Sequence, residues 1–118
     1  GMGAMGLPGD LSSQSRFVRA AFTKLNSSAY ASESESVSQF FHILGTVSQT
    51  ERCCRLENGS CEKTLYTSCC SAETGTYYYT TYGNHQITGV RMHGENLDGA
   101  SLVSYPLIRE EQFCMENS

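Results

Sequence analysis

The sequence lacks both a concentrated basic surface and a long hydrophobic run. Of its 118 residues, 8 are lysine or arginine and 12 are aspartate or glutamate, so the net charge is −4 at pH 7. Nucleic acids and anionic membranes bind clustered positive charge, so neither is expected as a partner. No apolar stretch approaches the roughly 18 residues of a membrane span, and no basic segment followed by an apolar one indicates a signal peptide. The composition, 39% hydrophobic, is instead typical of a globular domain.

A nucleotide site is also missing, although three early glycines match the G-x-G-x-x-G pattern of dinucleotide-binding proteins. These glycines are Gly1, Gly3 and Gly6. The pattern works only when a strand precedes the first glycine and a helix opens at the last, with the helix N-terminal amides facing a pyrophosphate. Nothing precedes Gly1, and residues 7–9 separate Gly6 from any helix. No nucleotide or other cofactor is therefore expected.

Cysteine is present, but not in the spacing of a zinc site. The chain has six cysteines, Cys53, Cys54, Cys61, Cys69, Cys70 and Cys114. Zinc knuckles use C-x2-C pairs, whereas the close pairs here are adjacent and, in a strand, would point to opposite faces. We expect mainly reduced cysteines packed as small hydrophobic side chains in a reducing cytosol; disulfides and a metal site are the alternatives.

Two amphipathic helices are predicted in the first half. Asp10 or Ser12 can cap the first, whose apolar stripe is Phe17, Val18, Ala21, Phe22 and Leu25. Residues 26–28 end it, and the Ser/Glu-rich residues 29–36 indicate a solvated connection. Ser32 and Glu35 have the spacing of a capping box that would open the second helix. Gly45 lies near the end of that helix. Its apolar stripe is Val37, Phe40, Phe41, Leu44 and Val47. His42 lies opposite that stripe and is expected to be solvated.

After a polar loop over residues 49–60, the pattern changes to β. Strands are predicted over residues 62–71, 76–82 and 86–92, with turn signals at Thr74–Gly75 and Gly83–Asn84. Connections this short imply an antiparallel meander. Residues 102–105 predict one further short strand.

The middle strand lacks a cover on one side. Its tyrosines, Tyr77, Tyr78, Tyr79 and Tyr82, place rings on both faces, which is typical of a strand covered on each side. Two helices with one stripe each can cover only one face. Because the sequence also begins at Gly1 rather than at a methionine, we expect an α+β piece of a larger domain or half of an oligomer.

Five segments, in order, closely resemble the C-terminal part of the choloylglycine hydrolases, which include conjugated bile salt hydrolases and penicillin V acylases. They are GLPGDLSSQSRFVRAAF, ESVSQFFHILGTV, TLYTSCCS, TYYYTTYGNHQI and MHGENLDGASLVSY. The resemblance covers residues 3–105. It implies the αββα sandwich of N-terminal-nucleophile hydrolases, with residues 1–118 as a single partial domain, the C-terminal third, and with no cofactor. It also implies a cytoplasmic bacterial homotetramer.

The chemistry that the resemblance implies is acyl transfer by an N-terminal cysteine. That nucleophile, a nearby arginine and aspartate and two asparagines lie upstream in the family, outside this chain. Within the S-R-F-V-R block, Arg16 matches an active-site arginine, a fixed cation that can hold a cysteine as thiolate. Arg19 is expected on the helix surface. Periodicity alone would make Arg16 solvated, because it lies nearly opposite the apolar stripe; the two interpretations agree if that face looks into a pocket formed by residues outside this chain.

The expected function is therefore that of part of an amide hydrolase whose small-molecule substrate is a glycine- or taurine-conjugated bile salt, inactive as this chain alone. The alternatives are a fragment of a penicillin V acylase-type amidase and a non-catalytic binding or oligomerisation module. Residues 49–60 are expected near the substrate mouth. A serine triad with His85, His93, Asp10 or Asp98 is not expected, because no G-x-S-x-G turn supports it.

Overall fold

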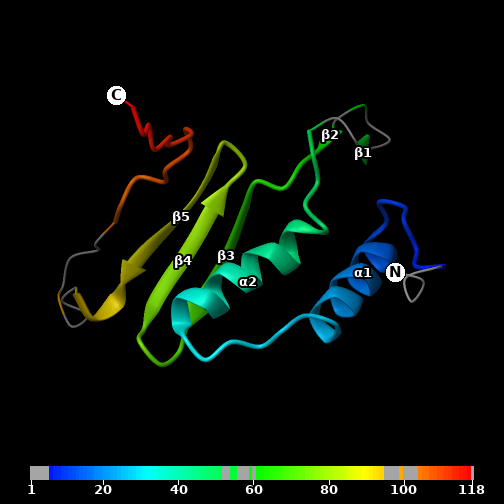
Figure 1. The fold of residues 1–118 in the computed structure, drawn as a ribbon. Helices are drawn as coiled ribbons and strands as arrows, with labels where there is room; N and C mark the ends of the chain where they lie inside the picture. The colour runs from blue at the N-terminus through cyan, green and yellow to red at the C-terminus, as the bar shows by residue number, and fades with distance from the viewer. Residues whose placement is uncertain are drawn as a thin grey trace. The chain divides into compact units, whose positions relative to one another are not determined.

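The computed structural model describes residues 6–51, 54–55, 59, 61–94, 99 and 104–117 (Figure 1). The chain forms two compact units, Gly1–Thr64 and Leu65–Ser118. The first contains helices α1 and α2 and strands β1 and β2, and the second contains strands β3, β4 and β5. The predicted α+β class is confirmed. Neither described helix has the length and apolar character needed to cross a membrane.

Helix α1, Ser13–Leu25, begins where the sequence predicts. Ser12 is its N-cap, and the Ser12 hydroxyl accepts a hydrogen bond from the backbone N–H of Ser15 at 3.2 Å. Asp10 lies outside the helix and accepts from the backbone N–H of Ser12 at 2.9 Å. At the other end, Asn26 donates its backbone and side-chain N–H groups to the Phe22 carbonyl, at 3.1 and 2.9 Å. The backbone bond is the last regular i to i−4 bond of the helix; the next N–H, that of Ser27, bonds only three residues back, to the Lys24 carbonyl at 3.4 Å, so the helix ends at the Asn26 C-cap.

Helix α2, Glu33–Gly45, opens with the predicted capping pair. The Ser32 hydroxyl accepts from the Glu35 backbone N–H at 3.3 Å and donates to Glu35 Oε1 at 2.6 Å. The predicted solvated connection over residues 29–36 was too long, since its last four residues form the first turn of α2. The Phe40 and Phe41 rings pack edge to face, with 5.4 Å between their ring centroids.

The region between the helices and the sheet differs from the prediction. Strands β1, Cys54–Arg55, and β2, Cys61–Glu62, form a short antiparallel pair where a polar loop was expected. The strand predicted over residues 62–71 is broken at residues 63–65. The Thr64 backbone N–H donates to the Gln49 carbonyl at 3.0 Å, so it is unavailable for a continuous strand ladder.

The predicted antiparallel meander is confirmed: β3, Tyr66–Ser71, β4, Thr76–Thr81, and β5, Asn84–Arg91, are hydrogen-bonded in that order. Strand β4 is central, as expected. Gly75 supplies the first turn with a φ of +65°, a conformation that favours glycine. The second turn is Tyr82–Gly83, and Asn84 opens β5 fully buried instead of lying in the turn.

The tyrosines of β4 are not equally covered. Tyr79 is 6% exposed and is the buried apolar residue of the described part, while Tyr77 on the same face is 38% exposed, its ring centre 6.1 Å from that of Tyr79. The described residues therefore leave Tyr77 partly uncovered, in line with the expectation that cover for β4 is missing from this chain. Much of the cover that the tyrosines need is not supplied by the described residues.

The C-terminal segment, residues 104–117, has no regular structure but is attached to the sheet. The Ile108 backbone N–H donates to the Tyr79 hydroxyl at 3.2 Å, and the Thr81 hydroxyl donates to the Ile108 carbonyl at 2.8 Å. Gly83 approaches so closely that a Cβ there would collide with the Arg109 carbonyl oxygen. Of the predicted last strand, Leu102 and Val103 lie outside the described residues, and residues 104–105 are not in a strand.

Candidate functional site

Arg16 lies in the first turns of α1, at the place where this helix meets the end of α2. Its backbone N–H makes an early hydrogen bond of the helix, to the Ser12 carbonyl at 2.9 Å. Its side chain is half-buried, and Nε donates to the Val47 carbonyl at 2.9 Å. The solvated position that helical periodicity predicts for Arg16 is therefore wrong.

The Val47 carbonyl is available because α2 tightens as it ends. The backbone N–H groups of Thr46, Val47 and Ser48 each bond three residues back, to Ile43, Leu44 and Gly45. This 3₁₀ pattern leaves the Val47 oxygen just beyond the helix, where the C-terminal end carries partial negative charge. The positively charged guanidinium of Arg16 is therefore stabilised beside this end of α2.

Most of the Arg16 guanidinium is left unused by the described residues. A guanidinium has five N–H donors, and the Nε donor is occupied by Val47. Within the described part of the chain, the Nη atoms make no hydrogen bond. A planar cation is thus held at one edge while its other edge presents N–H groups, an arrangement suited to an anion or a carbonyl oxygen.

The segment that follows Val47 is itself anchored. The Gln49 backbone N–H donates to the Thr64 hydroxyl at 2.8 Å, and the Thr64 backbone N–H donates back to the Gln49 carbonyl at 3.0 Å. Gln49 is buried, with 7% of its surface exposed. Two residues further on, Glu51 pairs with Lys63 at 3.6 Å.

Arg19 is a structural residue rather than the surface residue that was expected. It is half-buried, and Nη1 donates to the carbonyls of Pro8 and Asp10 at 3.2 and 2.6 Å. Arg19 thereby holds the segment before α1 against the helix. Nothing in the sequence indicates these two hydrogen bonds, because both acceptors are main-chain carbonyl oxygens.

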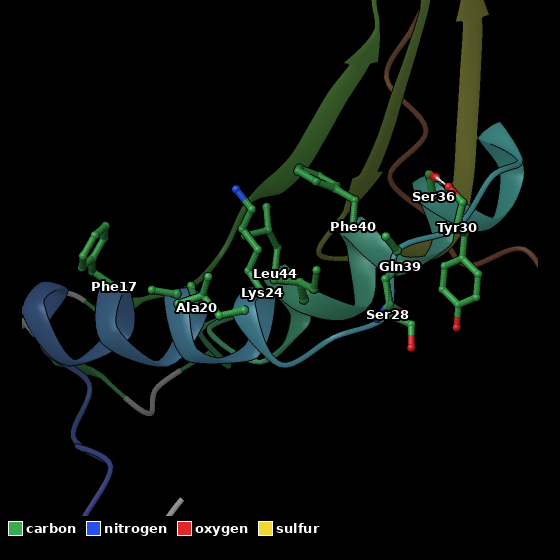
Figure 2. A pocket seen from close by; sticks show the side chains of 13 residues that line it. Phe17, Ala20, Lys24, Ser28, Tyr30, Ser36, Gln39, Phe40 and Leu44 are labelled. Carbon is green, nitrogen blue, oxygen red and sulfur yellow. Dashed lines mark hydrogen bonds between the residues drawn. The ribbon is translucent and has the colours of Figure 1, made fainter. Parts of the chain in front are cut away.

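A largely apolar groove of about 690 Å³ lies between α1 and α2 (Figure 2). Both predicted stripes contribute to it, with Phe17, Ala21 and Leu25 from α1 and Phe40 and Leu44 from α2. Phe17 and Leu25 remain 74% and 82% exposed. The stripes are thus correctly predicted, but the described residues leave them open. Arg16 does not line this groove.

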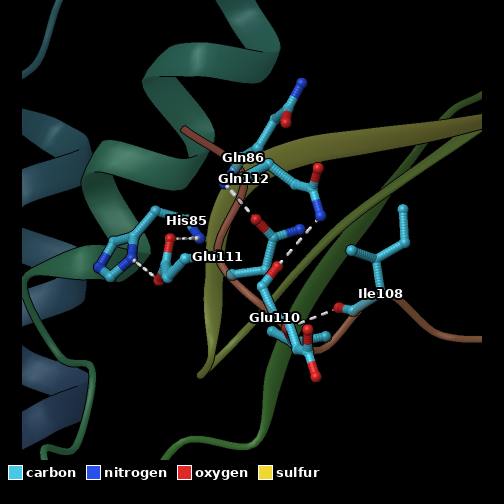
Figure 3. A network of polar contacts seen from close by, with 8 residues as sticks. His85, Gln86, Ile108, Glu110, Glu111 and Gln112 are labelled. Carbon is cyan, nitrogen blue, oxygen red and sulfur yellow. Dashed lines mark hydrogen bonds and ion pairs between the residues drawn. The ribbon is translucent and has the colours of Figure 1, made fainter. Parts of the chain in front are cut away.

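The histidines do not form a catalytic cluster. His85 contacts Glu111 of the C-terminal segment, with Nδ1 2.5 Å from Oε1, and the His85 backbone N–H donates to Oε2 at 3.2 Å (Figure 3). These hydrogen bonds lower the pKa of Glu111. His93 packs against Gly75, His42 is exposed as expected, and Asp98 lies outside the described residues. The described residues contain no group of three metal-binding side chains.

The cysteines are more exposed than the sequence suggested. Of the adjacent pair in β3, Cys69 is half-buried and Cys70 exposed, which confirms that they face different environments. Cys70 and Cys114 are free thiols on the surface. The exposure of Cys70 agrees with the prediction that one of the adjacent pair faces away from the core, whereas the prediction of a buried cysteine is wrong for Cys114. Cys53 lies outside the described residues, and the side chains of Cys54 and Cys61 are likewise not described.

The sequence and the fold together assign this chain to a class of linear amide C–N hydrolases. Residues 1–105 match the family described as linear amide C–N hydrolases, choloylglycine hydrolase family, and the chain belongs to that family. It is 57% identical over 117 residues to the bile salt hydrolase/transferase of Lactiplantibacillus plantarum, and 41% identical over 105 residues to that of Clostridium perfringens. These matches cover 99% and 89% of this chain but 36% and 32% of the relatives.

Solved structures agree with the family assignment. A variant of the conjugated bile acid hydrolase from Clostridium perfringens superposes with a TM-score of 0.86 at 37% identity, over 99% of this chain and 36% of that one. Penicillin V acylase from Agrobacterium tumefaciens shares the fold, with a TM-score of 0.65 at 19% identity over 77% of this chain. The chain thus has the fold of the corresponding part of these hydrolases and spans about a third of their length.

Proposed function

We propose that this chain is part of an amide hydrolase that deconjugates glycine- or taurine-conjugated bile salts. The observation that carries the proposal is the family membership together with 57% identity, along almost the whole chain, to a bile salt hydrolase/transferase. The nucleophile is an N-terminal cysteine supplied by residues outside these 118. On its own, this chain is inactive.

The proposed reaction is a two-step acyl transfer. The cysteine thiolate attacks the amide carbonyl carbon, and the nitrogen leaves as glycine or taurine after it takes a proton from the cysteine's own α-amino group. A thioester to the bile acid remains. Water then adds to the thioester carbonyl and returns the thiol and the free bile acid.

Arg16 is the residue of this chain that we assign to the site. A fixed cation beside a thiol favours the thiolate, and the unused Nη donors of Arg16 can bind an adjacent carboxylate or carbonyl. The bond from Nε to Val47 supports this role, because it holds the guanidinium in one orientation. We further propose that the complete protein is a cytoplasmic homotetramer.

Penicillin V acylase-type activity is the second candidate. The likeness in fold to such an acylase supports it, but at 19% identity it shows the fold alone. A non-catalytic binding or oligomerisation module is the third candidate, and the open apolar groove between α1 and α2 supports it.

The test is a hybrid enzyme in which this chain replaces the matching 117 residues of the Lactiplantibacillus plantarum relative. Release of glycine from glycocholate and taurine from taurocholate is measured, with penicillin V as the competing substrate. We expect bile salt cleavage to dominate. Preference for penicillin V would favour the second candidate, and a folded hybrid that cleaves neither would overturn the proposal.

The role of Arg16 is tested by Arg16→Ala in that hybrid. Loss of a fixed cation at a reacting centre lowers kcat by about 100-fold or more, and we expect this with little change in Tm. Lys24→Ala is the matched control, since Lys24 is an exposed cation on the same helix. Near wild-type turnover of Arg16→Ala would remove the arginine from the site.

A further inference from the structure

We propose that Thr64 is a positioning residue for this reaction, because its hydroxyl fixes the main-chain segment whose Val47 carbonyl orients Arg16. The inference rests on the proposed function. It assigns a role to a residue that touches neither the guanidinium nor any reacting group, and it follows from three contacts within the unit Gly1–Thr64.

The first contact sets the plane of the guanidinium. Arginine has a long side chain with many rotamers, so it takes up one orientation only when a contact selects it. The Nε–H of Arg16 points along one fixed direction in the guanidinium plane, so its bond to the Val47 oxygen selects that plane and the direction of the Nη donors. The orientation of the Arg16 guanidinium therefore depends on how firmly the Val47 oxygen is held in position.

The second and third contacts decide how well the oxygen is placed. Val47 and Ser48 lie beyond the last residue of α2, Gly45, and bond back to that helix through short-range contacts to Leu44 and Gly45. The next residue, Gln49, is clamped in both directions by Thr64: its N–H donates to the Thr64 hydroxyl at 2.8 Å, and its carbonyl accepts from the Thr64 N–H at 3.0 Å. This two-way bridge fixes the far end of the segment.

The neighbouring ion pair cannot serve the same purpose. Lys63 and Glu51 are 3.6 Å apart, with 34% and 54% of their side chains exposed. Exposed pairs of this kind contribute little and do not hold a backbone in one geometry. Lys63 therefore provides a control immediately beside Thr64.

The experiment compares Thr64→Val, which keeps the shape but removes the hydroxyl acceptor, with Thr64→Ser, which keeps the hydroxyl, in the active hybrid. A typical hydrogen bond is worth about 0.5–1.5 kcal/mol, so we expect Thr64→Val to lower kcat by about 2-fold to 10-fold with KM nearly unchanged. Thr64→Ser and Lys63→Ala should retain the parent kcat. If Thr64→Val fails to fold, Thr64→Ala takes its place.

A double-mutant cycle separates positioning from a structural role. In an Arg16→Ala background there is no guanidinium left to orient, so Thr64→Val should cause no further loss of kcat. An equal loss in both backgrounds, or a Thr64→Val variant with the parent kcat, would overturn the inference. An inactive parent hybrid would instead count against the proposed function itself, so the two failures are distinguishable.

Discussion

Asp10 carries a strongly perturbed carboxyl group at the start of α1. Hydrogen bonds from the side chain and backbone of Ser12 are the main cause, and they lower the Asp10 pKa from 3.8 to about 2. Because the folded value lies below the ordinary one, the charged carboxylate stabilises the folded state above about pH 3.8. That contribution is lost as the pH falls toward 2.

Removing the Ser12 hydroxyl should reverse part of this shift. We expect Ser12→Ala to raise the Asp10 pKa from about 2 toward 3.8, measured by NMR titration of the Asp10 carboxyl carbon. Ser13→Ala, the exposed serine next in the chain, is the control and should leave the value unchanged. An unchanged titration in Ser12→Ala would show that the backbone N–H of Ser12 alone sets the pKa.

The contacts of single residues could be predicted where both partners have characteristic side chains, and could not be predicted where an arginine bonds to a main-chain carbonyl. The capping pair Ser32 and Glu35 could be identified because both partners appear in the sequence at a fixed spacing. Arg16 and Arg19 were both misplaced by periodicity, since carbonyl acceptors leave no mark in a sequence.

The C-terminal segment passes close to Gly83, in the turn between β4 and β5, where the Arg109 carbonyl oxygen leaves no room for a Cβ atom. Gly83→Ala would place a Cβ against the Arg109 carbonyl oxygen, and overpacking of this kind costs about 1–3 kcal/mol. We expect the segment to be released from the sheet. Faster hydrogen exchange at the Ile108 amide, which donates to the Tyr79 hydroxyl, would report it.

The control for that substitution is Gly9→Ala, because a Cβ on Gly9 meets nothing within 4 Å. It should leave the exchange of the Ile108 amide as it is. If the Ile108 amide in Gly83→Ala is as well protected from hydrogen exchange as in the parent protein, the segment adjusts without leaving the sheet.

Helices and strands differ in how far their boundaries could be predicted. Both helices begin at the predicted caps, because capping is local, and the meander follows from short turns between β-rich runs. The break between β2 and β3 could not be predicted, because it arises from the bridge between Thr64 and Gln49, two residues far apart in the chain.

The molecule as described leaves much apolar surface uncovered. Leu25, Phe17 and Tyr66 are 82%, 74% and 60% exposed, while Tyr79 is the buried apolar residue of the described part. The relatives are about three times as long as the matched segment. This is why family resemblance predicted the architecture, whereas the pattern of the residues could only indicate that cover was missing.

We therefore expect the isolated 118 residues to bind a hydrophobic dye and to aggregate, because large exposed apolar patches associate in water. Dye fluorescence and size-exclusion chromatography measure both effects, and the hybrid enzyme is the control in which the same surfaces are covered. A clean monomer with a sharp cooperative melt would contradict the expectation of a missing layer.

The oxygen that orients Arg16 belongs to the main chain of Val47, and this has a genetic consequence. Every amino acid at position 47 supplies the same carbonyl, so a codon-by-codon scan of that position reports on the half-buried Val47 side chain and not on this bond. The bond to Arg16 would then be detected only by a chemical edit of the backbone itself, such as a thioamide in place of the Val47 carbonyl.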